Sequence, residues 1–422
     1  MTIANDGSTP LVAPVAVRQV DVEAGVDDLR LGASRSGRPY RSLLAIARGR
    51  NGPLATASFE VPAGGVLPRD LLIAGLRQRV KAVGEPWPDV VTAADAPGAA
   101  RQDVRAPAVS VVIATCRNPS ALERCVGSIL GSDYDNFDVI VVENAPGSSA
   151  SQQMLASRFP DDPRIRYVEE PRRGASWARN SGLAHAGGEI IAFTDDDVVV
   201  DRQWLRAGVD ALTSAPDVGC ATGLIVPLEL ESSSQLLLEQ FASFGKGFRR
   251  HTYRLADARR RDPLFPYTAG SIGSGASTVM WARIARELGG FDAVLGPGTP
   301  TRGAEDLDLF IRVLRTGHAV VYEPGAIVWH EHPAGMARLR RQVYHYGVGL
   351  GAMLAKQLIA GPERGYLLRA VPRGVRYLRD PSSRKNASKP RDYPRHLDFL
   401  ERLGMLVGPA AYLWSALLHL HR

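Results

Sequence analysis

Three consecutive aspartates, Asp195, Asp196 and Asp197, follow the apolar segment IIAFT. Adjacent carboxylates at the end of a buried strand repel one another and are costly to desolvate unless a cation lies among them. Their oxygens suit Mg²⁺ or Mn²⁺, and these ions also bind substrate phosphates. Asp195 and Asp197 are two residues apart, so in an extended segment they face the same side and can share one ion. The alternative is a solvated acidic turn after a strand.

A second acidic group opens a predicted helix further along the chain. Glu305 and Asp306 follow Arg302 and Gly303 in RGAEDLDLFIRVLRTGH, with Asp308 one turn on. Acids suit the positive end of a helix dipole, and this explains Asp308 without any catalytic role. Two adjacent acids at such a position can instead supply a general base.

His330 ends the apolar segment GAIVWH, and His332 follows shortly after. A lone histidine is more often structural. At a strand end, in a chain that also carries two aspartates at metal-ligand spacing, His330 is a candidate third metal ligand.

Cationic residues precede the aspartates in PRRGASWARNSGLAHAGG. Arg172, Arg173 and Arg179 offer fixed donors to an anion, and Gly174 lets the backbone approach a ligand closely. The amide groups at the start of the helix also favour anions. The alternative is an amphipathic helix with a solvated basic face.

The elements that must position these residues alternate between strands and helices. Strands are predicted at 109–115, 138–142, 165–168 and 189–194, and helices at 120–132, 149–158 and 174–186. This alternation predicts βαβ units and a parallel sheet, in which ligands bind at the carboxyl ends of the strands. Thr115, Glu143 and the three aspartates all lie at such ends, so we expect them to meet in one crevice. No GxGxxG or GxxxxGK[ST] motif occurs, which argues against dinucleotide and P-loop sites.

The chain of 422 residues carries a net charge of +7, which suits anionic partners. The excess is concentrated late in the chain, where residues 336–402 hold fifteen Lys/Arg against five Asp/Glu. Three cysteines match no disulfide or zinc pattern, and the N-terminus does not resemble a signal peptide, so we expect a cytoplasmic protein. Residues 403–418 are apolar but interrupted by Gly408 and Pro409. We expect them to pack in a core, with peripheral membrane contact as the alternative.

Composition predicts five segments. Residues 1–20 form a disordered lead-in, and 21–84 form a small α+β accessory module with a hairpin around Asn51-Gly52. Residues 85–107 are a Pro/Ala-rich linker. The catalytic α/β domain covers 108–335, and a basic helical extension covers 336–422.

Four stretches in order resemble the inverting family-2 glycosyltransferases of bacteria, which have the GT-A fold. They are VSVVIATCRNPSALERCVGSIL, DVIVVENAP, RRGASWARNSGLAHAGGEIIAFTDDD, and GGFDAVLGPGTPTRGAEDLDLFIRVLRTGHAVVYEP followed by WH. The resemblance covers roughly residues 107–332. It implies a mostly parallel, Rossmann-like sheet with flanking helices, and a metal-dependent transfer of a sugar from a nucleotide-diphosphate donor to a hydroxyl acceptor.

The resemblance also assigns roles to residues. It gives contacts with the donor nucleotide to Thr115, Arg117, Glu143, Arg173, Arg179, Asn180, Asp195 and Asp196. It implies that Asp195, Asp197 and His330 bind the divalent metal, Mn²⁺ or Mg²⁺. It places the catalytic residues in the Glu305–Asp306 pair, with Asp306 as the base itself. This chain departs from the family at Glu143, where aspartate is usual, and at Ser277 and Trp281, where asparagine and arginine are common. The donor sugar therefore cannot be copied from relatives.

The resemblance leaves several substrates open. A UDP-sugar is the default donor, with GDP- and dTDP-sugars as alternatives, and the acceptor is a glycan of the cell wall, a lipid-linked molecule or a small molecule. Two other functions compete, namely a nucleotidyltransferase and a catalytically silent scaffold that binds glycan or nucleotide. Binding of nucleic acid through the basic tail is weaker, because no recognised module for it is present.

Overall fold

The computed structural model describes residues 9–50, 52–88, 106–145, 147–242, 244–383, 385–386, 389 and 393–420. Its centre is a nine-stranded sheet with the order β10-β14-β11-β13-β9-β6-β7-β8, and β12 pairs with β14 beside this path. The strands are β6 (Val109–Thr115), β7 (Phe137–Glu143), β8 (Ile165–Glu169), β9 (Ile190–Asp195), β10 (Val198–Val200), β11 (Val218–Pro227), β12 (His251–Tyr253), β13 (Thr278–Trp281) and β14 (Ala319–His330).

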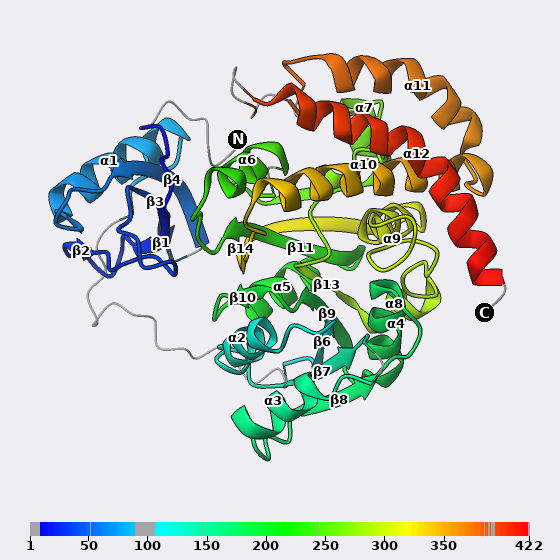
Figure 1. Ribbon diagram of the computed structural model, residues 1–422, viewed down its shortest axis with the longest axis horizontal. Coiled ribbons are helices and arrows are strands. Elements are labelled where there is room, and N and C mark those ends of the chain that lie inside the picture. The colour runs from blue at the N-terminus through cyan, green and yellow to red at the C-terminus, as the bar shows by residue number, and fades with distance from the viewer. Residues whose placement is uncertain are drawn as a thin grey trace.

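Most strands of this sheet share one direction. β6 pairs in parallel with β7 and β9, β7 with β8, and β11 with β14, whereas β10, β12 and β13 run antiparallel to their neighbours. The predicted α/β fold class, a mostly parallel sheet with flanking helices, is confirmed (Figure 1). The shared direction brings the carboxyl ends of β6, β7, β9 and β14 to the same edge.

Helices cover both faces of the sheet. One face packs against α2 (Pro119–Leu130), α3 (Ala150–Arg158) and α5 (Trp204–Leu212), and the other against α4 (Ala175–His185), α8 (Ala282–Glu287) and α9 (Glu305–Arg315). Alternate residues of β6 belong to opposite cores, with Val111 in one and Val112 in the other. Burial on both faces explains why these strands are continuous apolar runs rather than alternating ones.

The N-terminal module is a three-stranded sheet of β1 (Val15–Asp21), β3 (Ser42–Gly49) and β4 (Gly52–Glu60), with α1 (Arg69–Ala82) and the short pair β2 (Leu29–Arg30) and β5 (Val66–Leu67). The predicted hairpin is present as the antiparallel pair β3–β4. The expectation of disorder over residues 1–20 is wrong for β1, which pairs in parallel with β3. Val15 and Val17 also pack against β11 and β14 residues of the central sheet, so burial orders this segment.

Two of the predicted segments lie partly or largely outside the described residues. Residues 1–8 of the lead-in and residues 89–105 of the linker have no described structure, and neither has Asn51 of the hairpin turn.

The C-terminal extension is helical, as expected. It comprises α10 (Met336–Ile359), α11 (Arg364–Arg379) and α12 (Arg395–Leu420), and α6 (Ser233–Ala242), α7 (Leu255–Arg261) and a short 3₁₀ turn (Ala269–Ser271) lie nearby. Figure 1 shows α10, α11 and α12 together along one side of the molecule.

Residues 403–418 were expected to be interrupted at Gly408 and Pro409, and this expectation is wrong because α12 continues through both. Gly404 and Gly408 are where α12 meets α10. A Cβ on Gly408 would lie 2.5 Å from the backbone nitrogen of Ala352, and one on Gly404 would lie 2.3 Å from the carbonyl oxygen of Tyr344. Glycines four residues apart thus permit close backbone contact between the two helices.

Core packing of α12 was also expected, and it holds for only one face. Leu406 is 79% exposed and Trp414 is 59% exposed. Within the described residues, α12 is the one helix long and apolar enough to cross a membrane by length and composition.

Candidate active site at the carboxyl ends of the strands

The aspartates and His330 meet because of strand direction. Asp195 ends β9 and His330 ends β14, and β10 connects them by pairing Val198 with His330. Candidate ligand atoms of Asp195, Asp197 and His330 all lie within 4.8 Å of one another, and His330 Nε2 is 3.5 Å from Asp197 Oδ1. Two carboxylates and one imidazole are a donor set that fits Mn²⁺ or Mg²⁺.

The electrostatics of this cluster also fit a cation. Burial raises the pKa of Asp197, against the attraction of His330, and Asp195 adds to the rise. Burial likewise raises the pKa of Asp196 to about 7, against a hydrogen bond that its Oδ2 accepts from the Thr115 hydroxyl at 2.6 Å. A divalent cation would favour the ionised forms of these carboxylates.

Arg179 links the aspartates to the acidic pair on α9. Its guanidinium donates to Asp195 Oδ1 at 2.7 Å and to Glu305 Oε1 at 2.6 Å, and Arg179 is only 4% exposed. Burial opposes its charge, but Asp195 and Glu305 raise the pKa of Arg179 above its usual value. Glu305, predicted to share the catalytic role with Asp306, lines the same cleft, and its carboxylate is paired with Arg179.

Asp306 lines the cleft at the first turn of α9. Its Oδ2 accepts a hydrogen bond from the Gly275 amide at 2.8 Å, and its Oδ1 accepts one from the Leu307 amide at 2.8 Å. Burial raises the pKa of Asp306, against the bond from Gly275. Ala304, just before the helix, has a left-handed φ of 68°, and this turns the pair of acids into the site.

Six of the eight residues predicted to contact the donor nucleotide line the same cleft: Thr115, Arg117, Arg173, Arg179, Asp195 and Asp196. Neither Arg117 nor Arg173 has a carboxylate partner within the part of the chain that the structure describes, so both guanidinium groups are available to an anion.

Two other predicted residues do not line the cleft. Glu143 is 2% exposed and accepts a hydrogen bond from the Ser151 hydroxyl at 2.6 Å. Both ends of the Asn180 amide bond to the backbone of Phe291, so this side chain fixes the loop after α8. Asn144, which sequence reasoning missed, lines the cleft in the place expected of Glu143 and bonds to the backbone at Arg172 and Gly174.

A chain of buried polar groups stands behind His330. His330 Nδ1 lies 3.2 Å from His332 Nδ1, and His332 Nε2 lies 2.8 Å from Glu239 Oε2. Glu239 lies on α6, far away in sequence, so the sequence signal was limited to the His-x-His spacing. Such a chain fixes the orientation of His330 and leaves its Nε2 directed at Asp197.

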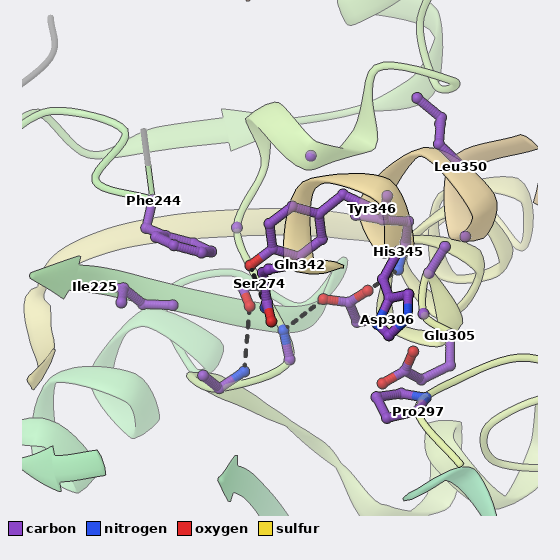
Figure 2. A pocket seen from close by; sticks show the side chains of 18 of the residues that line it. Ile225, Phe244, Ser274, Pro297, Glu305, Asp306, Gln342, His345, Tyr346 and Leu350 are labelled. Carbon is purple, nitrogen blue, oxygen red and sulfur yellow. Dashed lines mark hydrogen bonds between the residues drawn. The ribbon is translucent and has the colours of Figure 1, made fainter. Parts of the chain in front are cut away.

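Helix α10 supplies a wall that the expected catalytic segment, residues 108–335, did not include. Figure 2 shows Gln342, His345 and Tyr346 pointing from α10 into the pocket that Asp306 lines. Gln342 Nε2 donates to the Tyr346 hydroxyl at 2.8 Å. The cleft has a volume of about 2840 Å³, well above the ~300–1,000 Å³ of an ordinary small-molecule pocket.

Comparisons with known proteins find similarity over the central part of this chain. Residues 110–273 match the family described as Glycosyl transferase family 2. The pre-mycofactocin glycosyltransferase of Mycobacterium tuberculosis is 29% identical over 225 residues, which cover 53% of this chain and 43% of that protein. An N-acetylglucosaminyltransferase of Azorhizobium caulinodans is 27% identical over 241 residues, which cover 56% of this chain and 58% of that protein.

A solved structure is also similar, the mannosyltransferase PcManGT from Pyrobaculum calidifontis in complex with GDP-Man and Mn²⁺. It is 19% identical, with a TM-score of 0.47, and the match covers 75% of this chain and 88% of that one.

Proposed function

We propose that the chain, whose residues 110–273 match the family described as Glycosyl transferase family 2, is a metal-dependent inverting glycosyltransferase acting on a nucleotide-diphosphate sugar. One observation carries the proposal. A cluster of Asp195, Asp197 and His330 that suits a metal lies in the same cleft as the carboxylate of Asp306.

The donor side of the cleft fits a diphosphate. Asp195, Asp197 and His330 would hold Mn²⁺ or Mg²⁺, and the ion would neutralise negative charge on the departing diphosphate. Arg117 and Arg173 add cationic donors that suit phosphate oxygens. Thr115 orients Asp196 by a hydrogen bond and so keeps the ligand loop in place. We propose a UDP-sugar as the first donor to test.

The acceptor side fits a general base. Asp306 presents a carboxylate whose geometry is fixed by two backbone amides. It would remove the proton of the acceptor hydroxyl while that oxygen attacks the anomeric carbon from the face opposite the diphosphate. A single displacement of this kind inverts the anomeric centre.

The test is donor hydrolysis across UDP-, GDP- and dTDP-sugars with Mn²⁺ or Mg²⁺, comparing wild type with Asp197→Ala. We expect slow metal-dependent release of one nucleoside diphosphate, lost in the variant. Glu287→Ala is the matched control, because Glu287 is an exposed carboxylate outside the cleft. Absence of both release and saturable nucleotide binding would favour a silent scaffold. Release of pyrophosphate from a nucleoside triphosphate would favour a nucleotidyltransferase.

We also propose that α12 contacts the cytoplasmic face of a membrane peripherally. The exposed apolar residues Leu406, Leu413, Trp414 and Leu417 support this, as does the basic charge of the extension. Fractionation tests the proposal: unchanged soluble recovery after deletion of residues 403–422 would refute it.

A further inference from the structure

Helix α11 presents an apolar stripe to the cleft, and Leu367 at the beginning of this stripe also packs in the core beside the central sheet. The stripe consists of Leu367, Ala370, Val371, Gly374, Val375 and Leu378, all of which line the cleft. Their spacing is that of one face of an α-helix. Val371 is 47% exposed and Val375 is 42% exposed, so the part of the stripe away from Leu367 is open to solvent.

Helix α10 forms the opposite wall, and the residues of α10 that line the cleft change from polar to apolar along the helix. A Cβ on Gly349 would lie 3.0 Å from the backbone carbon of Gly303, so this part of α10 adjoins the loop just before α9, whose first turn carries Asp306. Before Gly349 the lining residues are polar, and after it they are Leu350 and Leu354. Leu354 lies about 7.5 Å further along the helix axis than Gly349. The cleft therefore becomes apolar within roughly two turns of the catalytic loop.

The segment after α7 closes the third side of this groove. Pro263, Leu264 and Phe265 line the same cleft. The Tyr366 hydroxyl donates to the carbonyl oxygen of Pro263 at 2.7 Å, and this bond holds the start of α11 against the segment. Residues of α7, α10 and α11 thus line one groove that is continuous with the cleft and open to solvent at Val371 and Val375.

Cationic side chains accompany the apolar lining. Arg261, Arg302 and Arg338 line the cleft, and none has a carboxylate partner among the residues described. Burial, together with the charges of Arg302 and Arg341, lowers the pKa of His345, which lines the same cleft. An apolar groove beside unpaired guanidinium groups suits an amphiphile with an acidic head and a hydrocarbon chain.

We propose that the groove between α7, α10 and α11 binds the hydrocarbon chain of an amphiphilic acceptor, and that Arg302, four residues before Asp306, binds its acidic head. The inference rests on the proposed glycosyl transfer and specifies its acceptor class. The volume of the cleft agrees with it, because a nucleotide sugar alone would leave much of about 2840 Å³ empty.

Dodecyl phosphate, used below its critical micelle concentration, is the probe. Its binding is measured by calorimetry with the full chain, with the double variant Val371→Asp/Val375→Asp, and with the matched control Leu368→Asp. Leu368 lies on the same helix and is 60% exposed, but it does not line the cleft. All three positions are largely solvent-accessible, so folding should tolerate the changes.

We expect the wild type and Leu368→Asp to bind dodecyl phosphate equally, and the double variant to bind more than about tenfold more weakly. Each buried methylene contributes about fourfold to affinity, so losing two or three contacts is enough. Inorganic phosphate should bind far more weakly than the amphiphile.

Four results would overturn the proposal: no binding by the wild type, equal binding by all three proteins, equal loss in both variants, or inorganic phosphate binding as tightly as the amphiphile. Equal loss in both variants would indicate adsorption on the outer surface of α11. Donor hydrolysis by the wild type is measured separately, so failure of the acceptor groove and failure of the transferase activity are distinguishable.

Discussion

Arg179 offers a direct test of how the site is assembled. It is the cation between Asp195 and Glu305, at 2.7 and 2.6 Å, and its side chain is almost fully buried. Arg179→Met keeps much of the aliphatic part of the side chain but leaves the buried carboxylate of Glu305 without its cationic partner. Breaking a buried ion pair in this way costs about 3–5 kcal/mol of unfolding free energy.

The effect should depend on pH, and its sign follows from Glu305. Burial already raises the pKa of Glu305, and Arg179 opposes that rise. Without Arg179 the folded-state pKa rises further above the unfolded value of about 4.3. A raised folded-state pKa gives stability that is lost as pH increases through it, so the variant should lose more stability at pH 8 than at pH 5.

The assay is urea unfolding in EDTA at both pH values. With a urea m-value of about 3 kcal/mol/M, a loss of 3–5 kcal/mol lowers the midpoint by about 1–1.7 M. Arg202→Met is the control, because Arg202 also pairs with an aspartate but its side chain is 78% exposed, and it should change stability by less than about 1 kcal/mol. Adding Glu305→Gln to Arg179→Met should restore part of the loss. A loss below about 1 kcal/mol at pH 8, or one equally large at pH 5, would refute the reasoning.

Three further predictions test other parts of the site. Asp306→Asn should lower the rate of glycosyl transfer by about 10²–10⁴-fold and leave the nucleotide affinity unchanged. Because burial raises the pKa of Asp306, the wild-type rate should increase with pH above the range in which an ordinary aspartate titrates. An Asp306→Asn variant that keeps this increase would contradict the role of Asp306 as the base. His332→Gln should weaken Mn²⁺ binding, followed by electron paramagnetic resonance, by about 10–100-fold through misorientation of His330; unchanged affinity would show that the buried chain does not position the ligand. Gly182→Ala should lower the free energy of unfolding by about 1–3 kcal/mol, measured by thermal unfolding, because a Cβ there would lie 2.3 Å from Cγ1 of the buried Val112. Gly187→Ala is the control and should be nearly neutral, because a Cβ at that position would have no neighbour within 4 Å.

The sequence by itself determined the sheet and the edge at which chemistry occurs. Apolar runs such as 109–115 and 189–194 specify strands buried on both faces, and the helices between them specify parallel pairing. Because parallel strands end at one edge, the position of Asp195 at the end of β9 followed from local pattern alone. Residue type and position made His330 and Asp306 candidates, the resemblance assigned their roles, and the structure places both in the cleft with Asp195.

Other parts of the site depended on contacts between residues far apart in the chain. Glu143 matched a family position, yet the fold turns it toward Ser151, and Asn144 lines the cleft. Glu239 contacts His332 although the two residues are 93 positions apart in the sequence, and a local sequence pattern cannot predict such a contact.

The tertiary structure alone decided the far end of the cleft. The sequence showed apolar positions on α11 and α12, but hydrophobic periodicity marks a face that is apolar without saying what covers it. Glycine contacts such as that of Gly408 turn one face of α12 toward α10, whereas the stripe of α11 faces the cleft. Whether an apolar face is buried depends on how the whole chain packs. An apolar face therefore contacts another helix in α12 but lines a groove in α11.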